Sequence, residues 1–102
     1  MQVRIQFQGT ESSPWMDQLI RKKVCKLNRY LRASSTVLVT LKADGKCFKS
    51  TICIQDRRQD FTFSAIGYNL YESFSITLDM AVKSMSDHHK KLKARVHRKF
   101  AA

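Results

Sequence analysis

Several residue types on which particular folds and functions depend are scarce in this chain of 102 residues. The cysteines number three and form no C-x-x-C pair, which argues against a disulfide framework and against a zinc site. With three glycines and one proline, the sequence has no phosphate-cradling glycine loop and no flexible linker. No apolar run approaches the roughly 18 residues of a membrane span. Because the chain does not open with a basic and then an apolar block, we expect no signal peptide and a cytoplasmic protein.

Acidic residues are also scarce, with eight Asp and Glu against nineteen Lys and Arg and a formal net charge of +11. This density of positive charge favours polyphosphate backbones or anionic membrane surfaces as partners. A nuclease or transferase would need clustered carboxylates or a His–carboxylate pair, and the eight acids are scattered. His88, in the adjacent pair with His89, falls on an apolar stripe and is expected to be packed. We therefore expect no enzyme, no metal and no cofactor.

Periodic patterns predict six elements of secondary structure. Alternation of Val3, Ile5 and Phe7 with polar residues predicts a half-buried first strand. Ser13 before Pro14 is typical of an N-cap followed by a proline at the first helical position, so a helix is expected from Pro14 to Leu31. Three further strands are predicted over Thr36–Ala43, Lys46–Gln55 and Asp60–Ile66, the first two joined by an Asp44-Gly45 hairpin. The three cysteines are expected to be buried or half-buried.

The last element is a helix after Asn69 whose apolar residues recur every three or four positions. Its predicted inner face consists of Leu70, Phe74, Leu78, Ala81, Met85, His88 and Leu92. The element order predicts an α+β two-layer β-α-β-β-β-α sandwich, with a four-stranded mixed sheet and two helices on one face. The first strand should be parallel to its neighbour, because a helix connects them. We expect a single domain over residues 1–102, with a basic tail over residues 94–102.

The positive charge is concentrated on the two predicted helices. Residues 14–32, Lys83 and residues 84–102 together hold thirteen of the nineteen basic side chains. Lys22, Lys26 and Arg29 lie on one flank of the first helix. Two helices side by side would combine these cations into one positive surface, whereas solvated helices kept soluble by lysine are the structural alternative. Tyr30, Tyr68 and Tyr71 could stack on bases, with packing at the core or its shoulder favoured for Tyr30 and Tyr71 and the role of Tyr68 open.

Two segments resemble the ribosome hibernation-promoting factors, also known as ribosome-associated inhibitor or sigma-54 modulation proteins. KKVCKLNRYL (Lys22–Leu31) is similar to the family's K-x-x-K-L-x-x-Y/W block. SAIGYNLY (Ser64–Tyr71) is similar to the A-S-A-x-x-x-D-M-Y element that leads into the last helix. The resemblance extends over residues 1–93 and includes the opening MQVRI.

The resemblance implies a non-enzymatic protein in the mRNA and tRNA channel of the small ribosomal subunit. Such a protein holds ribosomes inactive in stationary phase or stress, and short family members are associated with 100S dimers. Its partners would be the 30S or 70S ribosome, 16S rRNA and neighbouring ribosomal proteins, with the factor itself expected to be a monomer. The RNA-facing positions that match are Lys23, Lys26 and Arg29 on the first helix and Lys83 and Lys91 on the second. With the charge pattern, the predicted RNA-binding set is Lys22, Lys23, Lys26, Arg29, Lys83, Lys90, Lys91, Lys93 and Arg95.

The chain departs from the family pattern at several positions. Met80 and Asp87 stand where basic or polar groups are usual on the last helix, and Asn69 replaces an aspartate that would serve as its N-cap. Arg57 and Arg58 occupy a turn that is usually rich in glycine. These departures suggest a binding face shifted toward the first helix and the tail segment Lys93–Lys99. Two other functions remain open: a general binder of structured or double-stranded RNA without ribosome specificity, and a protein of the membrane surface.

Overall fold

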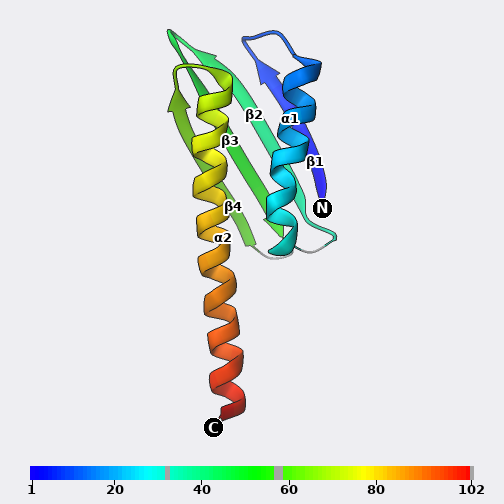
Figure 1. Cartoon of the computed structure of the whole chain (residues 1–102), viewed down its shortest axis with the longest axis vertical. Helices are drawn as coiled ribbons and strands as arrows, with labels where there is room; N and C mark the ends of the chain where they lie inside the picture. Colours follow the sequence, from blue (N-terminus) through cyan, green and yellow to red (C-terminus); the bar gives the residue numbers. More distant parts are fainter. Residues whose placement is uncertain (32, 57–58, 102) are drawn as a thin grey trace.

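The computed structural model describes the backbone of residues 1–31, 33–56 and 59–101, and within these ranges the side chains up to Lys90. The predicted order of elements is confirmed (Figure 1). The elements are β1 (Gln2–Gln8), α1 (Pro14–Val24), the short 3₁₀ helix η1 (Cys25–Arg29), β2 (Thr36–Asp44), β3 (Cys47–Asp56), β4 (Gln59–Gly67) and α2 (Leu70–Ala101). Arg57 and Arg58, which the sequence placed in a turn, lie outside the described residues.

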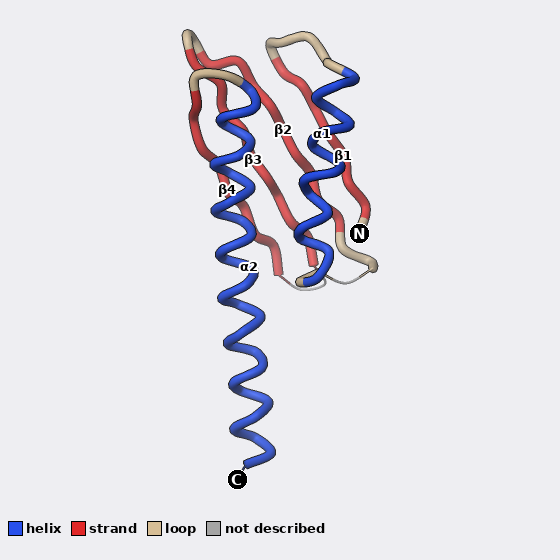
Figure 2. Tube along the Cα trace, in the orientation of Figure 1, coloured by secondary structure: helices blue, strands red, loops and turns tan. Residues whose placement is uncertain are grey.

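The four strands form one mixed sheet in the order β1-β2-β3-β4. β1 is parallel to β2, and the other two pairings are antiparallel. Figure 2 shows both helices in one layer on the same face of the sheet, with α1 over the β1–β2 side and α2 over the β3–β4 side. The α+β two-layer architecture expected from the sequence is therefore present. The hairpin between β2 and β3 turns at Gly45, whose φ of 63° is readily adopted only by glycine.

The core lies between the sheet and the two helices. Val37, Val39 and Leu41 alternate along β2 toward the helices, and Ile52 and Ile54 do so along β3. The helices contribute Met16, Ile20, Val24, Leu27, Phe74, Leu78, Ala81 and Met85, all of them buried. Burying each large aliphatic side chain stabilises the fold by about 1.5–3 kcal/mol. The inner faces of both helices are thereby held against the sheet, which leaves their flanks and outer faces for other contacts.

The first helix is shorter than the sequence predicted. The α-helix ends at Val24, and the chain continues to Arg29 as a 3₁₀ helix in place of an α-helix to Leu31. In a 3₁₀ helix the side chains at i and i+3 eclipse one another. Leu27 therefore stays on the buried side below Val24, and Lys26 and Arg29 lie in one row. The tighter turn closes with a hydrogen bond of 3.0 Å from the Tyr30 N–H to the Leu27 carbonyl.

Both helices begin at side-chain caps. The Ser13 hydroxyl accepts a hydrogen bond of 3.2 Å from the Met16 N–H, as expected from the sequence. Asn69 caps α2, because its side-chain oxygen accepts a hydrogen bond of 2.7 Å from the Glu72 N–H. Gly67 allows this close start, since a Cβ there would lie 2.6 Å from the Ser73 nitrogen. The beginning of α2 is thus placed accurately against the end of β4.

α2 continues well past the end of the sheet, as Figure 1 shows. Its helical backbone reaches Ala101 and includes most of the segment expected as a basic tail. Within the part of the chain that the structure describes, no helix is long and apolar enough to cross a membrane. Cys47 and Cys53 are half-buried as expected, whereas Cys25 is exposed and its thiol lies 3.2 Å from the Arg21 carbonyl.

Candidate nucleic-acid interface

A groove runs between the two helices, and we call it the inter-helical groove. One wall is formed by Lys23 of α1 and Lys26 of η1. The opposite wall comes from α2, and the complete lining is Lys23, Lys26, Tyr71, Phe74, Ser75, Leu78 and Asp79. The structure therefore brings two of the predicted RNA-binding lysines to the boundary between the helices, where a ligand could contact both.

Helical periodicity explains why these side chains face one another. Ile20 and Val24 point into the core, so Lys23, one position before Val24, lies at the edge of the buried face and is half-buried. On α2, Phe74 and Leu78 point toward the sheet, and the residues that follow each of them, Ser75 and Asp79, line the groove. Polar side chains thus border an apolar floor along the length of the groove.

Tyr30 marks a second meeting point of the two helices. Its ring lies with its centroid 5.9 Å from that of His89 in an edge-on arrangement. Hydrogen bonding with the Ser86 hydroxyl, and then with the Arg29 guanidinium, lowers the pKa of the Tyr30 phenol below its ordinary value, and the charge of Lys90 acts in the same direction. Arg29 of η1 and Lys90 of α2 therefore lie near the same phenol, although they are far apart in the sequence.

The charges along this boundary are predominantly positive. Among the residues that the structure describes, the one ion pair within 4 Å joins Arg21 to Asp17 at 2.7 Å. Arg21 also donates to the Val3 carbonyl at 3.1 Å, so this pair belongs to the β1 side of the molecule. Lys23 and Lys26 are consequently not neutralised by an ion pair, and Asp79 is the carboxylate that shares the groove with them.

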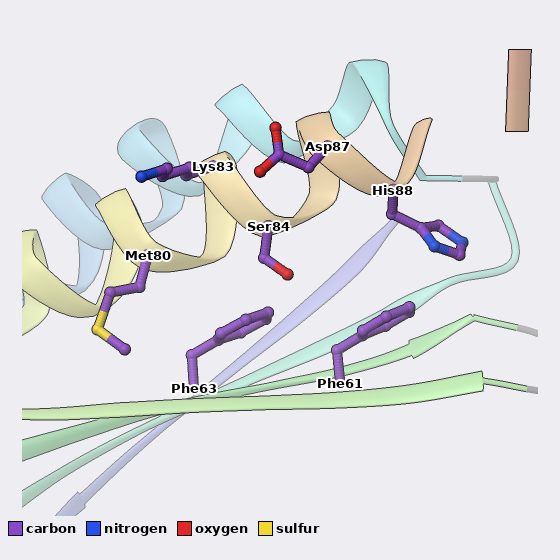
Figure 3. Close-up of a pocket in the computed structure, with 7 residues that line it drawn as sticks. All are labelled: Phe61, Phe63, Met80, Lys83, Ser84, Asp87 and His88. Atoms are coloured by element: carbon purple, nitrogen blue, oxygen red, sulfur yellow. The ribbon is translucent and has the colours of Figure 1, made fainter. Parts of the chain in front are cut away.

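A different hollow lies on the other flank of α2, and we call it the β4-side hollow (Figure 3). It is lined by Phe61, Phe63, Met80, Lys83, Ser84, Asp87 and His88. Figure 3 shows Phe61 and Phe63 rising from β4 toward the helix, with Lys83 and Asp87 on its upper side. The His88 ring contacts Phe61 edge-on at a centroid distance of 5.4 Å, so the expectation that His88 is a packed residue is confirmed.

The predicted RNA-binding residues therefore divide into separate groups. Lys23 and Lys26 line the inter-helical groove, and Arg29 and Lys90 meet near Tyr30. Lys83 lines the β4-side hollow, so the structure does not bring it together with the lysines of α1 and η1. Lys22 is exposed on α1. The side chains of Lys91, Lys93 and Arg95 lie outside the described residues.

Sequence reasoning missed an exposed group of aromatic residues at the start of both helices, which we call the aromatic hollow. It is lined by Ser13, Trp15, Met16, Phe48, Asn69, Leu70 and Tyr71. Tyr71, expected at the core or its shoulder, is 46% exposed, and Trp15 is 68% exposed. A sequence signal was available for Trp15, because it precedes Lys22 by seven residues and so lies on the same flank of α1. Tyr30, in contrast, packs against the core as expected.

No group of three or more His, Cys, Asp or Glu side chains that could hold a metal ion occurs within the described portion of the chain. The groups that the site does offer are cations and aromatic rings along the inter-helical groove and the aromatic hollow. These groups suit recognition of an extended anion by charge and shape.

Two solved structures share the fold of this chain. The N-terminal domain of Thermus thermophilus Protein Y matches with a TM-score of 0.77 and 17% identity, over 86% of this chain and 99% of that one. A ribosomal subunit interface protein from Coxiella burnetii matches with a TM-score of 0.74 and 13% identity, over 88% of this chain and 99% of that one. At these identities the likeness shows a common fold.

The family is established by the sequence itself. The model of the family described as sigma 54 modulation protein / S30EA ribosomal protein matches residues 3–96, and the chain belongs to this family. No curated protein sequence matches the chain. The family is one of ribosome-associated proteins and is not an enzyme family, which agrees with the resemblance found in residues 22–31 and 64–71.

Proposed function

We propose that this protein binds the small ribosomal subunit in the channel for mRNA and tRNA and keeps the ribosome inactive in stationary phase or stress. The observation that carries the proposal is the inter-helical groove, where Lys23 and Lys26 face α2 without an ion-pair partner. Family membership supplies the ribosome as the partner, and the groove supplies the surface on which its RNA would bind.

The physical basis is the attraction between this surface and the phosphates of 16S rRNA. Each phosphate that a lysine or arginine neutralises releases condensed counterions, so affinity should fall steeply as salt rises. Folded RNA can be recognised by its shape and backbone without base-specific hydrogen bonds. The groove lysines, together with Arg29 and Lys90, could follow a phosphate backbone between the helices. Lys22 on α1 and Lys91, Lys93 and Arg95 on the extended helix would add further contacts.

The experiment that tests the proposal is competition on purified 30S subunits. We expect the bound protein to exclude messenger RNA and initiator tRNA, and these ligands in excess to displace it. Simultaneous binding of all three at saturation would place the protein outside the channel. A sucrose-gradient profile of stationary-phase ribosomes, with and without the protein, then shows whether the inactive particles are 70S monomers or 100S dimers.

Free duplex RNA distinguishes ribosome recognition from general binding of structured RNA. We expect an excess of unrelated duplex RNA to leave most of the protein on 30S subunits at moderate salt. Equal affinity for the duplex and the subunit would favour the general RNA-binding function. Flotation with anionic liposomes tests the membrane-surface alternative, and for that test we expect the protein to remain unbound.

A further inference from the structure

The aromatic hollow contains large aromatic side chains that are exposed to solvent and so are not part of the hydrophobic core. Trp15 and Tyr71 remain largely in solvent, whereas Phe74, one turn along α2 from Tyr71, is 1% exposed. The hollow has a volume of about 540 Å³, within the range of roughly 300–1,000 Å³ that is common for ligand pockets. It is open to solvent, and its lining is mainly apolar.

The aromatic hollow and the inter-helical groove adjoin at Tyr71. Tyr71 lines both of them, with Trp15 and Phe48 on one side and Lys23 and Lys26 on the other. A ligand lying along the groove could therefore reach the aromatic rings without crossing another part of the surface. Any ligand that occupies both regions must combine negative charge with a flat apolar group.

The side-chain oxygens of the two polar residues in the hollow already accept hydrogen bonds that cap the helices. The Ser13 hydroxyl oxygen accepts a hydrogen bond from the Met16 N–H, and the Asn69 side-chain oxygen accepts one from the Glu72 N–H. Recognition in the hollow would thus depend on contact with ring faces more than on hydrogen bonding. Stacking on aromatic side chains has this character and tolerates any base, because every base has a π-face.

We propose that the aromatic hollow receives an unpaired nucleobase of an RNA strand whose phosphates lie along the inter-helical groove. This inference rests on the proposed function and deepens it, because it assigns single-stranded RNA to one end of the binding surface. The net charge of +11 and the adjoining lysines favour a polyanion over an uncharged peptide. A base inside a duplex is stacked and paired, so only a loop, a bulge or a single strand could insert one.

The first test uses Trp15 as a fluorescent reporter, because it is the one tryptophan of the chain. The unmodified protein is titrated with a single-stranded oligoadenylate, with a duplex RNA of equal length and with inorganic polyphosphate. We expect the oligoadenylate to quench the tryptophan emission, and the duplex and the base-free polyphosphate to bind with little quenching. Equal quenching by polyphosphate, or binding of oligoadenylate without quenching, would overturn the inference.

The second test compares variants by the anisotropy of a labelled oligoadenylate at constant salt. Trp15→Ala should weaken binding by about 5- to 160-fold, the range expected for loss of one stacked base. Trp15→Phe keeps a ring and should restore most of the affinity. Met80→Ala is the matched control, since it truncates an exposed apolar side chain in the β4-side hollow and should leave binding unchanged. Circular-dichroism melts check that each variant is folded.

Binding of the same variants to 30S subunits separates this inference from the proposed function. If Trp15→Ala weakens binding to 30S subunits but not to oligoadenylate, the hollow contacts a protein surface and the inference is wrong, while the proposed function stands. If the unmodified protein binds oligoadenylate with quenching but does not bind 30S subunits, the proposed function fails and the base-binding hollow remains.

Discussion

The two flanks of α2 are built alike but differ in charge. On the α1 side, the inter-helical groove combines Lys23 and Lys26 with a single carboxylate, Asp79. On the other side, the β4-side hollow contains one lysine, Lys83, and one carboxylate, Asp87. Both have apolar floors that include phenylalanine. The groove therefore has a surplus of positive charge, and the β4-side hollow is balanced.

The difference arises from what each flank faces. α2 contributes a carboxylate to both sides, so the helix itself does not favour either one for an anion. The α1 side becomes positive because α1 and η1 place lysines opposite, whereas β4 places Phe61 and Phe63 there. The binding face thus depends on two elements that face each other, and the charge pattern along one helix does not show where it lies.

The largest effect should come from reversing the groove lysines together. Lys23→Glu combined with Lys26→Glu is expected to weaken binding to 30S subunits by at least about a hundredfold, because each charged contact contributes roughly 1.5–3 kcal/mol. The slope of log affinity against log salt should also fall by about 1.4–1.8 if each lysine contacts one phosphate. Co-sedimentation at several salt concentrations measures both quantities.

A matched charge reversal controls for net charge. Lys42 and Lys49 are exposed cross-strand neighbours on β2 and β3, at positions that alternate with the residues facing the helices. Replacing both by glutamate changes the net charge by the same amount. We expect a much smaller loss of affinity from this pair. If the two double variants lose affinity equally, the groove has no special role and the comparison of the two flanks has no functional meaning.

Altering the N-cap of α2 should change the stability of the fold by a smaller free energy than the groove reversal changes binding. The cap matters to both flanks, because it fixes where α2 begins. Asn69→Ala removes the acceptor for the Glu72 N–H and should lower the free energy of unfolding by about 1 kcal/mol. Asn28→Ala, an exposed change in η1, should stay within about 0.5 kcal/mol of the unmodified protein. Urea denaturation followed by circular dichroism measures both. Equal stabilities of the two variants would show that the cap contributes little.

Neutralising the carboxylates, one on each flank, should sharpen the comparison further. Asp79→Asn removes the negative charge from the groove and should strengthen 30S binding by about 1.4- to 5-fold, as expected for a surface charge worth 0.2–1 kcal/mol. Asp87→Asn makes the same chemical change in the β4-side hollow and should have no measurable effect. A gain from Asp87→Asn that matched or exceeded the gain from Asp79→Asn would reverse the assignment of the binding flank.

The smallest effect is expected for Lys83, which the family resemblance assigned to the RNA-binding set. Its place in the β4-side hollow beside Asp87 leads us to expect less than a twofold change in 30S affinity for Lys83→Ala, within the range of a surface substitution of up to about 0.5 kcal/mol. Lys26→Ala, the same truncation in the groove, should weaken binding clearly more. A loss for Lys83→Ala as large as that for Lys26→Ala would extend the interface across the outer face of α2.

Local patterns in the sequence predicted most of the fold, because each depends on neighbours within a few residues. The caps at Ser13 and Asn69 and the turn at Gly45 all occur where the sequence indicated them. The end of the first α-helix was predicted too late, because the apolar stripe continues into the 3₁₀ helix after Val24, where Leu27 is also buried. Residue periodicity alone therefore does not distinguish the end of the α-helix from the 3₁₀ helix that follows it.

The candidate site was predicted only in part for the same reason. The sequence located the cations on α1 and η1, but it did not separate Lys83 from them or show that Trp15 and Tyr71 share a hollow. Trp15 and Tyr71 are remote in the chain, and their proximity depends on how α1 and α2 lie on the sheet. Tyr71 was expected at the core or its shoulder, but it lies on the flank of α2 that borders the groove.

By itself, the amino-acid sequence determined the order of the elements, their inward faces, the excess of positive charge and the family, because periodicity, composition and motif spacing are properties of the chain alone. The tertiary structure decided which charges act together. Packing both helices on one face of the sheet sets Lys23 and Lys26 against α2, whereas Lys83 lies outside this groove and lines the β4-side hollow. Electrostatic attraction falls with distance in space, whatever the separation along the chain, so only the folded arrangement could define the groove.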